Sequence, residues 1–156
     1  MTILDQLAEH AGERVSEAKR KISPKDLKQQ ALSMKKGSFA FEKALRKDGI
    51  SFICECKKAS PSKGLIAPEF PYLQIAEEYE VAGADGISVL TEPKWFLGSD
   101  AIFEEVRKNI QLPMIRKDFT VDDYQIYQAK CMGADAVLLS CSLMDEKRLS
   151  HFLTIC

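Results

Sequence analysis

From residue 50 onward, short apolar runs alternate with amphipathic stretches, and this alternation restricts the possible folds more than any other feature of the chain. Apolar runs of this length predict strands, and stretches with helical periodicity predict helices. Strands that alternate with helices favour parallel pairing through right-handed crossovers, so the fold class is α/β. Four strand–helix units are predicted, with strands at 51–56, 86–90, 113–116 and 136–139 and helices at 71–82, 100–110, 121–132 and 145–156.

Two similar turns precede two of these strands. The segments 82–86 (AGADG) and 132–136 (MGADA) each follow a predicted helix and open a predicted strand. Glycine there allows the left-handed conformation that ends many helices. The pair indicates either one repeated unit or two helix-to-strand turns of the kind that any such fold needs. The segment 83–86 does not fit a nucleotide-binding loop, because it precedes a strand and does not open a helix.

The first 48 residues differ from the rest, because they contain helical periodicity and no strand candidate. Apolar positions such as Leu7 and Val15 recur at helical spacing, and Ser23 followed by Pro24 predicts the start of a second helix. We therefore expect a helical extension over 1–48 and a βα region over 49–156, forming one structural domain overall.

Charge and cysteine content exclude several classes of protein. The 22 basic and 23 acidic residues nearly cancel, which gives no reason to expect binding to nucleic acid or to a membrane surface. The charged amino-terminal segment does not fit a signal peptide, and no apolar run is long enough for a membrane span. The five cysteines form no CxxC pair and lie at no zinc-site spacing from His10 or His151. We expect a soluble, cytoplasmic protein without a metal site.

Charged residues collect where the predicted strands end, which is where parallel α/β folds place their chemistry. Glu55 and Lys57 follow the first strand and, being two residues apart, share one face. Lys117 ends the third strand, where low-dielectric surroundings would make its ammonium group a better proton donor in catalysis. Alternatively, Lys117 and Asp118 form a solvated pair at a helix start. After the second strand, Trp95 and Phe96 lie in a loop, either as an apolar wall for a ring or as a staple for the loop.

These residues lie in segments that resemble the indole-3-glycerol-phosphate synthase family of tryptophan biosynthesis. The segments are 52–64 (FICECKKASPSKG), 83–99 (GADGISVLTEPKWFLGS), 113–119 (PMIRKDF) and 133–139 (GADAVLL). The resemblance implies a lyase, a carboxy-lyase that closes a ring on a phosphorylated 1-(2-carboxyphenylamino)-1-deoxyribulose, with loss of carbon dioxide and water. It implies a TIM (β/α)8 barrel, a small phosphorylated substrate as partner, and neither a metal nor an organic cofactor.

The resemblance also implies roles for individual residues. Lys117 would be the general acid, Lys57 would steer the anionic groups of the substrate, and Glu55 would orient both lysines. Four further residues would contact the aromatic end of the substrate, with Ser60 and Pro61 at the anthranilate group and Phe96 and Phe119 forming its apolar wall.

The family barrel has eight βα units in roughly 250 residues, whereas this chain has four after the helical extension. The resemblance places the general base and the phosphate loops in the absent units, so we expect little activity from this chain alone. The chain could be a fragment, could self-associate through its half-barrel edges, or could form an open sheet with helices on both faces. Alternative functions are an assembly module or another phosphosugar barrel enzyme, such as the neighbouring isomerase, for which a Cys/Asp pair would be expected.

Overall fold

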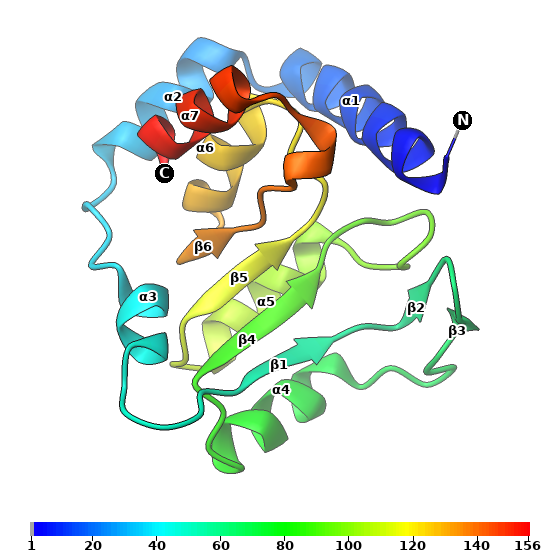
Figure 1. The fold of residues 1–156 in the computed structure, drawn as a ribbon, viewed down its shortest axis with the longest axis vertical. Coiled ribbons are helices and arrows are strands. Elements are labelled where there is room, and N and C mark those ends of the chain that lie inside the picture. Colours follow the sequence, from blue (N-terminus) through cyan, green and yellow to red (C-terminus); the bar gives the residue numbers. More distant parts are fainter. Residues whose placement is uncertain (1) are drawn as a thin grey trace.

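A computed structural model describes residues 2–156, and its centre is a parallel four-stranded sheet. The strands are β1 (Ile53–Cys56), β4 (Gly86–Leu90), β5 (Met114–Lys117) and β6 (Ala136–Val137), in the order β1-β4-β5-β6 (Figure 1). All four predicted strands are therefore present, although β1 and β6 are each two residues shorter than expected. Within residues 2–156, β6 lies at an edge of the sheet and pairs only with β5. The order runs in one direction, whereas the strand order of a doubly wound sheet reverses.

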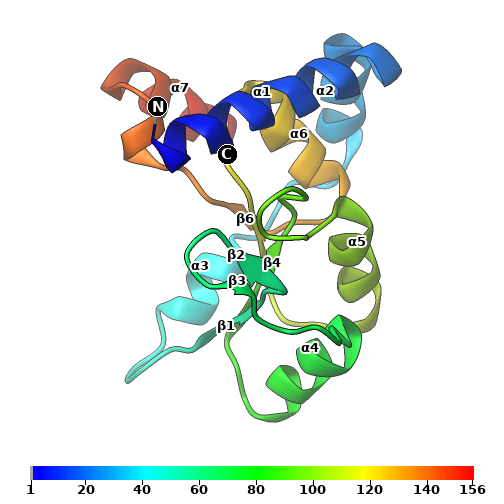
Figure 2. The same cartoon turned by 90° about the vertical axis from the view of Figure 1, so that its right-hand side faces the viewer.

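Three helices connect the strands and cover one face of the sheet. They are α4 (Tyr72–Val81), α5 (Asp100–Asn109) and α6 (Asp123–Cys131), as Figure 2 shows. The core between sheet and helices contains Ile87 and Val89 of β4 packed with Phe103 and Val106 of α5, all fully buried. Arg116 of β5 points to the same side, where it contacts α5 and α6. These three helices lie on the same side of the sheet, so they do not show the arrangement with helices on both faces that is one sequence-based alternative.

The two similar turns have the same structural role. Gly83 and Gly133 have φ angles of 89° and 84°, the left-handed conformation expected at both helix ends. The aspartate two residues later then accepts a backbone hydrogen bond near the start of the neighbouring strand. Asp85 accepts from the Phe52 amide at 2.8 Å and Asp135 from the Met114 amide at 2.9 Å. This shared contact favours one repeated βα unit.

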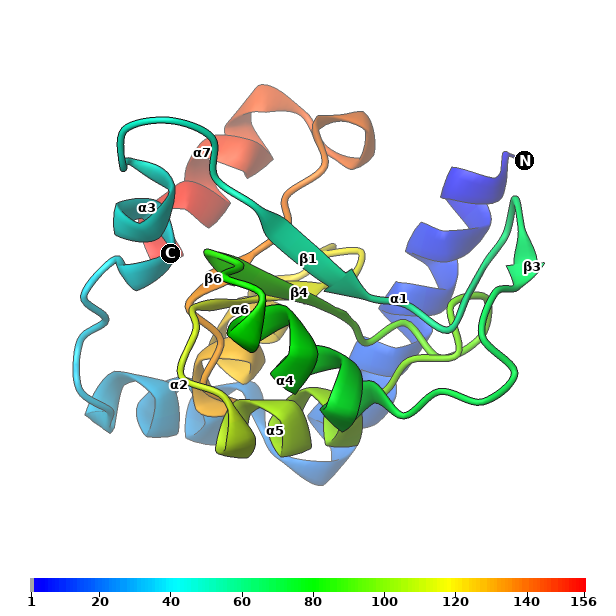
Figure 3. The same cartoon turned by 90° about the horizontal axis from the view of Figure 1, so that it is seen from below.

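The amino-terminal extension is helical, as predicted, and contains α1 (Ile3–Lys21), α2 (Pro24–Ser33) and α3 (Ala40–Leu45). Ser23 caps α2, since its hydroxyl accepts from the Asp26 amide at 3.1 Å. Helix α1 lies beside the carboxyl ends of the strands, α2 packs on α6, and α3 lies near the amino-terminal end of β4 (Figures 1 and 3). No helix in the described part of the chain is long and apolar enough to cross a membrane.

Several elements were not anticipated from the sequence. The segment after β1 forms a small antiparallel hairpin from β2 (Ala59–Ser60) and β3 (Gly64–Leu65). A short 3₁₀ helix, η1 (Cys141–Leu143), precedes the expected helix α7 (Glu146–Ile155). Within residues 2–156, β1 has a partner strand on one side only, and the side chains of Phe52 and Ile53 near its start are about half exposed.

Candidate functional site

The three residues with predicted catalytic roles meet at the carboxyl ends of β1 and β5. The Glu55 carboxylate accepts from Lys117 Nζ at 2.8 Å and lies 3.0 Å from Lys57 Nζ. It also accepts from the Ser88 hydroxyl at 3.1 Å. Parallel register brings these residues together, because Glu55 pairs with Ser88 and the next strand places Lys117 beside Leu90. Two ammonium groups therefore share one carboxylate on the sheet face opposite α4 and α5.

This cluster is half-buried rather than sealed. About a third of each lysine side chain and 27% of the Glu55 side chain are accessible. Burial tends to raise the pKa of Glu55, but hydrogen bonds and charges from Lys117 and Lys57 outweigh it and lower that pKa. Glu55 is thus held as a carboxylate. The accessible ammonium hydrogens can contact an anion or donate a proton to a carbonyl oxygen.

Two of the four predicted binding residues form an aromatic pair. The rings of Phe96, in the loop after β4, and Phe119, after β5, have centroids 6.0 Å apart at an interplanar angle of 42°. Trp95 instead packs its ring against His10 of α1. The two aromatic residues of this loop thus have different partners, and the apolar wall stays a prediction. Trp95 fastens the loop, whereas Phe96 is positioned to form part of a wall.

Ser60 and Pro61, the other two predicted binding residues, lie in the β2–β3 hairpin. Ser60 is buried, and its hydroxyl accepts from the Lys63 amide at 3.2 Å within the hairpin. Pro61 is exposed at the hairpin turn. The hairpin follows directly from the strand that carries Glu55, but its serine hydroxyl is engaged locally and is not hydrogen-bonded to the lysine cluster.

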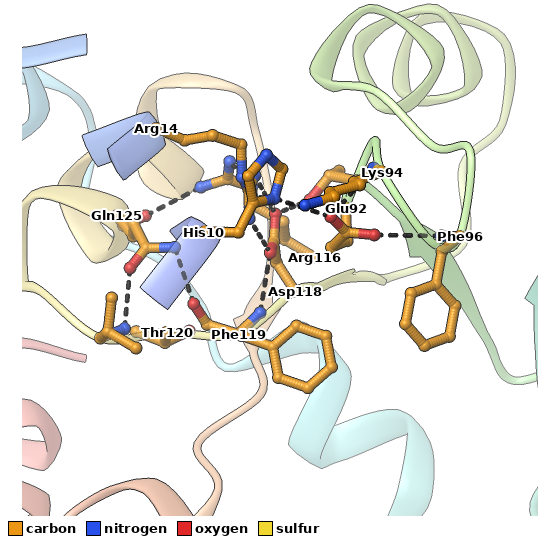
Figure 4. Close-up of polar contacts among 12 residues, drawn as sticks. His10, Arg14, Glu92, Lys94, Phe96, Arg116, Asp118, Phe119, Thr120 and Gln125 are labelled. Carbon is orange, nitrogen blue, oxygen red and sulfur yellow. Dashed lines mark hydrogen bonds and ion pairs between the residues drawn. The ribbon is translucent and has the colours of Figure 1, made fainter. Parts of the chain in front are cut away.

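A buried ionic cluster beside the site was missed from the sequence. The Asp118 carboxylate accepts two hydrogen bonds from the Arg14 guanidinium, at 3.0 and 2.7 Å, and one from the Thr91 hydroxyl (Figure 4). Arg116 lies 3.8 Å from the same carboxylate. Burial tends to raise the pKa of Asp118, but the Arg14 and Arg116 charges and these hydrogen bonds lower it overall. The alternative of a solvated Lys117–Asp118 pair is wrong, because the two residues have different partners.

Glu92 is a second buried carboxylate that was not assigned a role from the sequence. Its side chain is fully buried and accepts from His10 Nδ1 at 3.1 Å and from three backbone amides of its own loop. Both buried carboxylates thus receive a side chain from α1, across more than 80 residues of sequence. Glu92 and Asp118 stand out only as acidic residues next to apolar strands; their partners on α1 could not be identified from local spacing.

A separate cavity does not include Glu55, Lys57 or Lys117. A cavity of about 280 Å³ lies between α1, α5 and α6 and is lined by Arg14 and Arg116 among others. In the part of the chain that the structure describes, no three His, Cys, Asp or Glu side chains converge where a metal ion could be held.

The fold and the site together define a parallel α/β protein whose charged residues collect at the carboxyl edge of its sheet. A family model described as indole-3-glycerol phosphate synthase matches residues 4–155. The chain belongs to the indole-3-glycerol phosphate synthase family.

Individual relatives carry the same name and are longer than this chain. The indole-3-glycerol phosphate synthase of Ruminiclostridium cellulolyticum is 51% identical over 154 residues, which cover 98% of this chain and 59% of that protein. The protein of that name from Endomicrobium trichonymphae is 51% identical and is covered to 59%. The one from Lachnoclostridium phytofermentans is 45% identical and is covered to 61%. The chain spans about three fifths of the length of these curated relatives.

Proposed function

We propose that this chain supplies the proton-donating part of an indole-3-glycerol phosphate synthase. The observation that supports the proposal is the Glu55 carboxylate between Lys57 and Lys117, at the carboxyl edge of a parallel sheet. The reaction converts 1-(2-carboxyphenylamino)-1-deoxyribulose 5-phosphate to indole-3-glycerol phosphate. It is a carboxy-lyase reaction of tryptophan biosynthesis, and we propose that the protein carries it out in the cytoplasm.

In the first step, the ring carbon that bears the carboxylate attacks the ketone carbon of the substrate. A carbon–carbon bond forms, and the electron pair of the C=O bond moves to oxygen, which takes a proton from Lys117 Nζ. Negative charge develops on that oxygen, so an ammonium group favours the transition state over the ground state. Loss of carbon dioxide then returns the electron pair of the broken C–C bond to the aromatic ring. The five-membered ring is already closed at this point, and loss of water, with the hydroxyl leaving the former ketone carbon and a proton leaving the neighbouring methylene carbon, forms the double bond of the pyrrole.

The remaining residues of the site have binding roles in this proposal. Lys57 attracts the anionic groups of the substrate, and Glu55 fixes both lysines by direct hydrogen bonds. Phe96 and Phe119 pack against the anthranilate ring, and the Ser60–Pro61 turn borders it. The aromatic pair and the carboxylate cluster follow adjacent strands, which is compatible with one substrate spanning both.

For the fold, we propose that residues 49–156 are the first four βα units of a (β/α)8 barrel and that residues 1–48 are its helical extension, within one structural domain. The one-directional strand order and the helices on a single face support this. The general base and phosphate loops would lie in the other four units. Expressed by itself, the chain would associate with a second copy through the β1 edge, where Phe52 and Ile53 are exposed.

The proposal is tested by assaying turnover of the carboxyphenylamino-deoxyribulose phosphate through indole fluorescence, with sedimentation to establish the oligomeric state. Binding of the same substrate is measured by calorimetry. Lys117→Ala is compared with Lys108→Ala, which removes an exposed lysine of α5. We expect low turnover that Lys117→Ala abolishes and Lys108→Ala preserves. Substrate binding and turnover that are unaffected by Lys117→Ala would contradict the assigned acid.

A further inference from the structure

The loop that carries Phe96 is organised around one buried carboxylate. Glu92 accepts hydrogen bonds from the backbone amides of Lys94 at 3.0 Å, Trp95 at 2.8 Å and Phe96 at 3.0 Å. Its own carbonyl accepts from the Gly98 amide at 2.9 Å, which closes the loop. Three successive residues therefore have their amides directed at a single side chain, and their backbone positions depend on it.

The geometry of this loop leaves little freedom. A Cβ at Gly98 would overlap the backbone carbonyl of Leu90, so the two loop ends are in direct contact. Leu97 has a φ angle of 53°, a left-handed conformation that is unfavourable for leucine and persists only where the surroundings impose it. The hydrogen bonds to Glu92 on the preceding residues provide such a constraint.

Helix α1 contacts this loop at two points, and both involve His10. The Nδ1 atom of His10 lies 3.1 Å from Glu92 Oε1 (Figure 4). The His10 ring also meets the Trp95 ring edge-on, with centroids 5.5 Å apart. His10 is about a fifth exposed, whereas Glu92 is fully buried. The docked helix therefore completes the set of donors around the carboxylate.

We propose that Glu92 is a positioning residue for the aromatic wall, and that His10 makes this positioning depend on the docking of α1. The inference rests on the proposed function in so far as Phe96 contacts the anthranilate ring of the substrate. Glu92 itself lies behind the wall and acts through the backbone of Phe96. The amino-terminal extension would thus determine how well the site accepts an aromatic acid, although the cluster itself consists of Glu55, Lys57 and Lys117, which lie outside α1.

The test combines amide hydrogen exchange with binding of anthranilate, both on the 156-residue chain. Glu92→Gln keeps the shape but has one acceptor oxygen in place of two, so amides 94–96 should exchange about tenfold faster relative to the rest of the chain. Anthranilate affinity, followed by energy transfer from Trp95, the single tryptophan, should fall by about the same factor. Glu104→Gln, the same change at an exposed position of α5, is the control.

His10→Ala leaves the Glu92 carboxylate in place and tests the positioning role if Glu92→Gln does not fold. We expect a change in Trp95 emission and a selective, few-fold faster exchange at residues 94–96. Exchange that rises uniformly over the chain, or not at all, would overturn the positioning role. Absence of anthranilate binding to the unsubstituted chain would count against the proposed function instead, and the exchange rates decide the positioning role in either case.

Discussion

Lys117 and Asp118 are adjacent in the sequence, yet they belong to two charge clusters of opposite character. The Lys117 side chain is 34% exposed and binds Glu55 of β1, on the face away from the helices. The Asp118 side chain is 3% exposed and binds Arg14 of α1. Alternation at the end of a strand sends neighbouring side chains to opposite sides. The carboxyl end of β5 therefore places one side chain in a partly exposed cluster and the next in a buried one.

The difference in exposure indicates that the Glu55 cluster and the Asp118 cluster have different roles. Ion pairs in contact with water contribute little to folding, and their groups remain available to a ligand. A buried pair has lost its hydration, so each partner depends on the other and removal of either leaves a charge that is poorly solvated. We infer that the Glu55 cluster is kept for binding and proton transfer, whereas the Asp118 cluster fastens the helical extension to the sheet.

Asp118→Asn should give the largest loss of stability. The substitution leaves the Arg14 guanidinium without its bidentate partner, and the expected decrease in the free energy of unfolding is about 3–5 kcal/mol. Urea unfolding followed by circular dichroism measures it. Asp48→Asn, at an exposed position, is the matched control and should change stability by less than about 0.5 kcal/mol. Equal effects of the two substitutions would remove the distinction between the clusters.

Arg14→Ala should have a smaller effect than Asp118→Asn, because the Arg14 side chain is 22% exposed and Asp118 retains Thr91 and Arg116 as partners. We expect a loss of about 2–3 kcal/mol. A double-mutant cycle with Asp118→Asn isolates the coupling, for which we expect about 1–3 kcal/mol. Additive effects in the cycle would show that Arg14 and Asp118 stabilise the fold independently.

The sequence was sufficient to predict what depends on local periodicity. Four strands, the linking helices and the left-handed glycines follow from spacing, and the alternation of Glu55 and Lys57 predicted one shared face. The rule that parallel strands collect their carboxyl ends at one edge predicted that Glu55 and Lys117 would lie at the same edge, and the family resemblance predicted that they would pair.

The contacts made by α1 could not be predicted in this way. The pairs His10–Glu92 and Arg14–Asp118 join residues 82 and 104 positions apart, and they depend on where the extension packs. The β2–β3 hairpin was missed for a different reason, since it has only two residues in each strand and no alternation long enough to detect.

Acid should reduce the contribution of the Asp118 cluster to stability. The pKa of Asp118 is lowered in the folded state from its ordinary value of 3.8. Its contribution to stability is therefore complete above about pH 4 and is lost as the pH falls through the lowered value, because the unfolded chain takes up the proton first. Stability measured by urea unfolding between pH 5 and pH 2 should fall less steeply for Asp118→Asn than for the unsubstituted chain. Parallel curves would contradict the lowered pKa.

Glu55→Gln should change stability least and binding most, which is the opposite of the effect expected for Asp118→Asn. Lys57 and Lys117 are each about a third exposed and can turn toward water when the carboxylate is lost. We expect the free energy of unfolding to change by less than about 1 kcal/mol. Binding of the carboxyphenylamino-deoxyribulose phosphate should weaken about tenfold, because a glutamine no longer fixes the two ammonium groups. Calorimetric titration and urea unfolding of the same preparation measure both quantities. A loss of several kcal/mol with unchanged binding would instead make Glu55 a structural residue like Asp118, and the two charge clusters would then no longer differ in function.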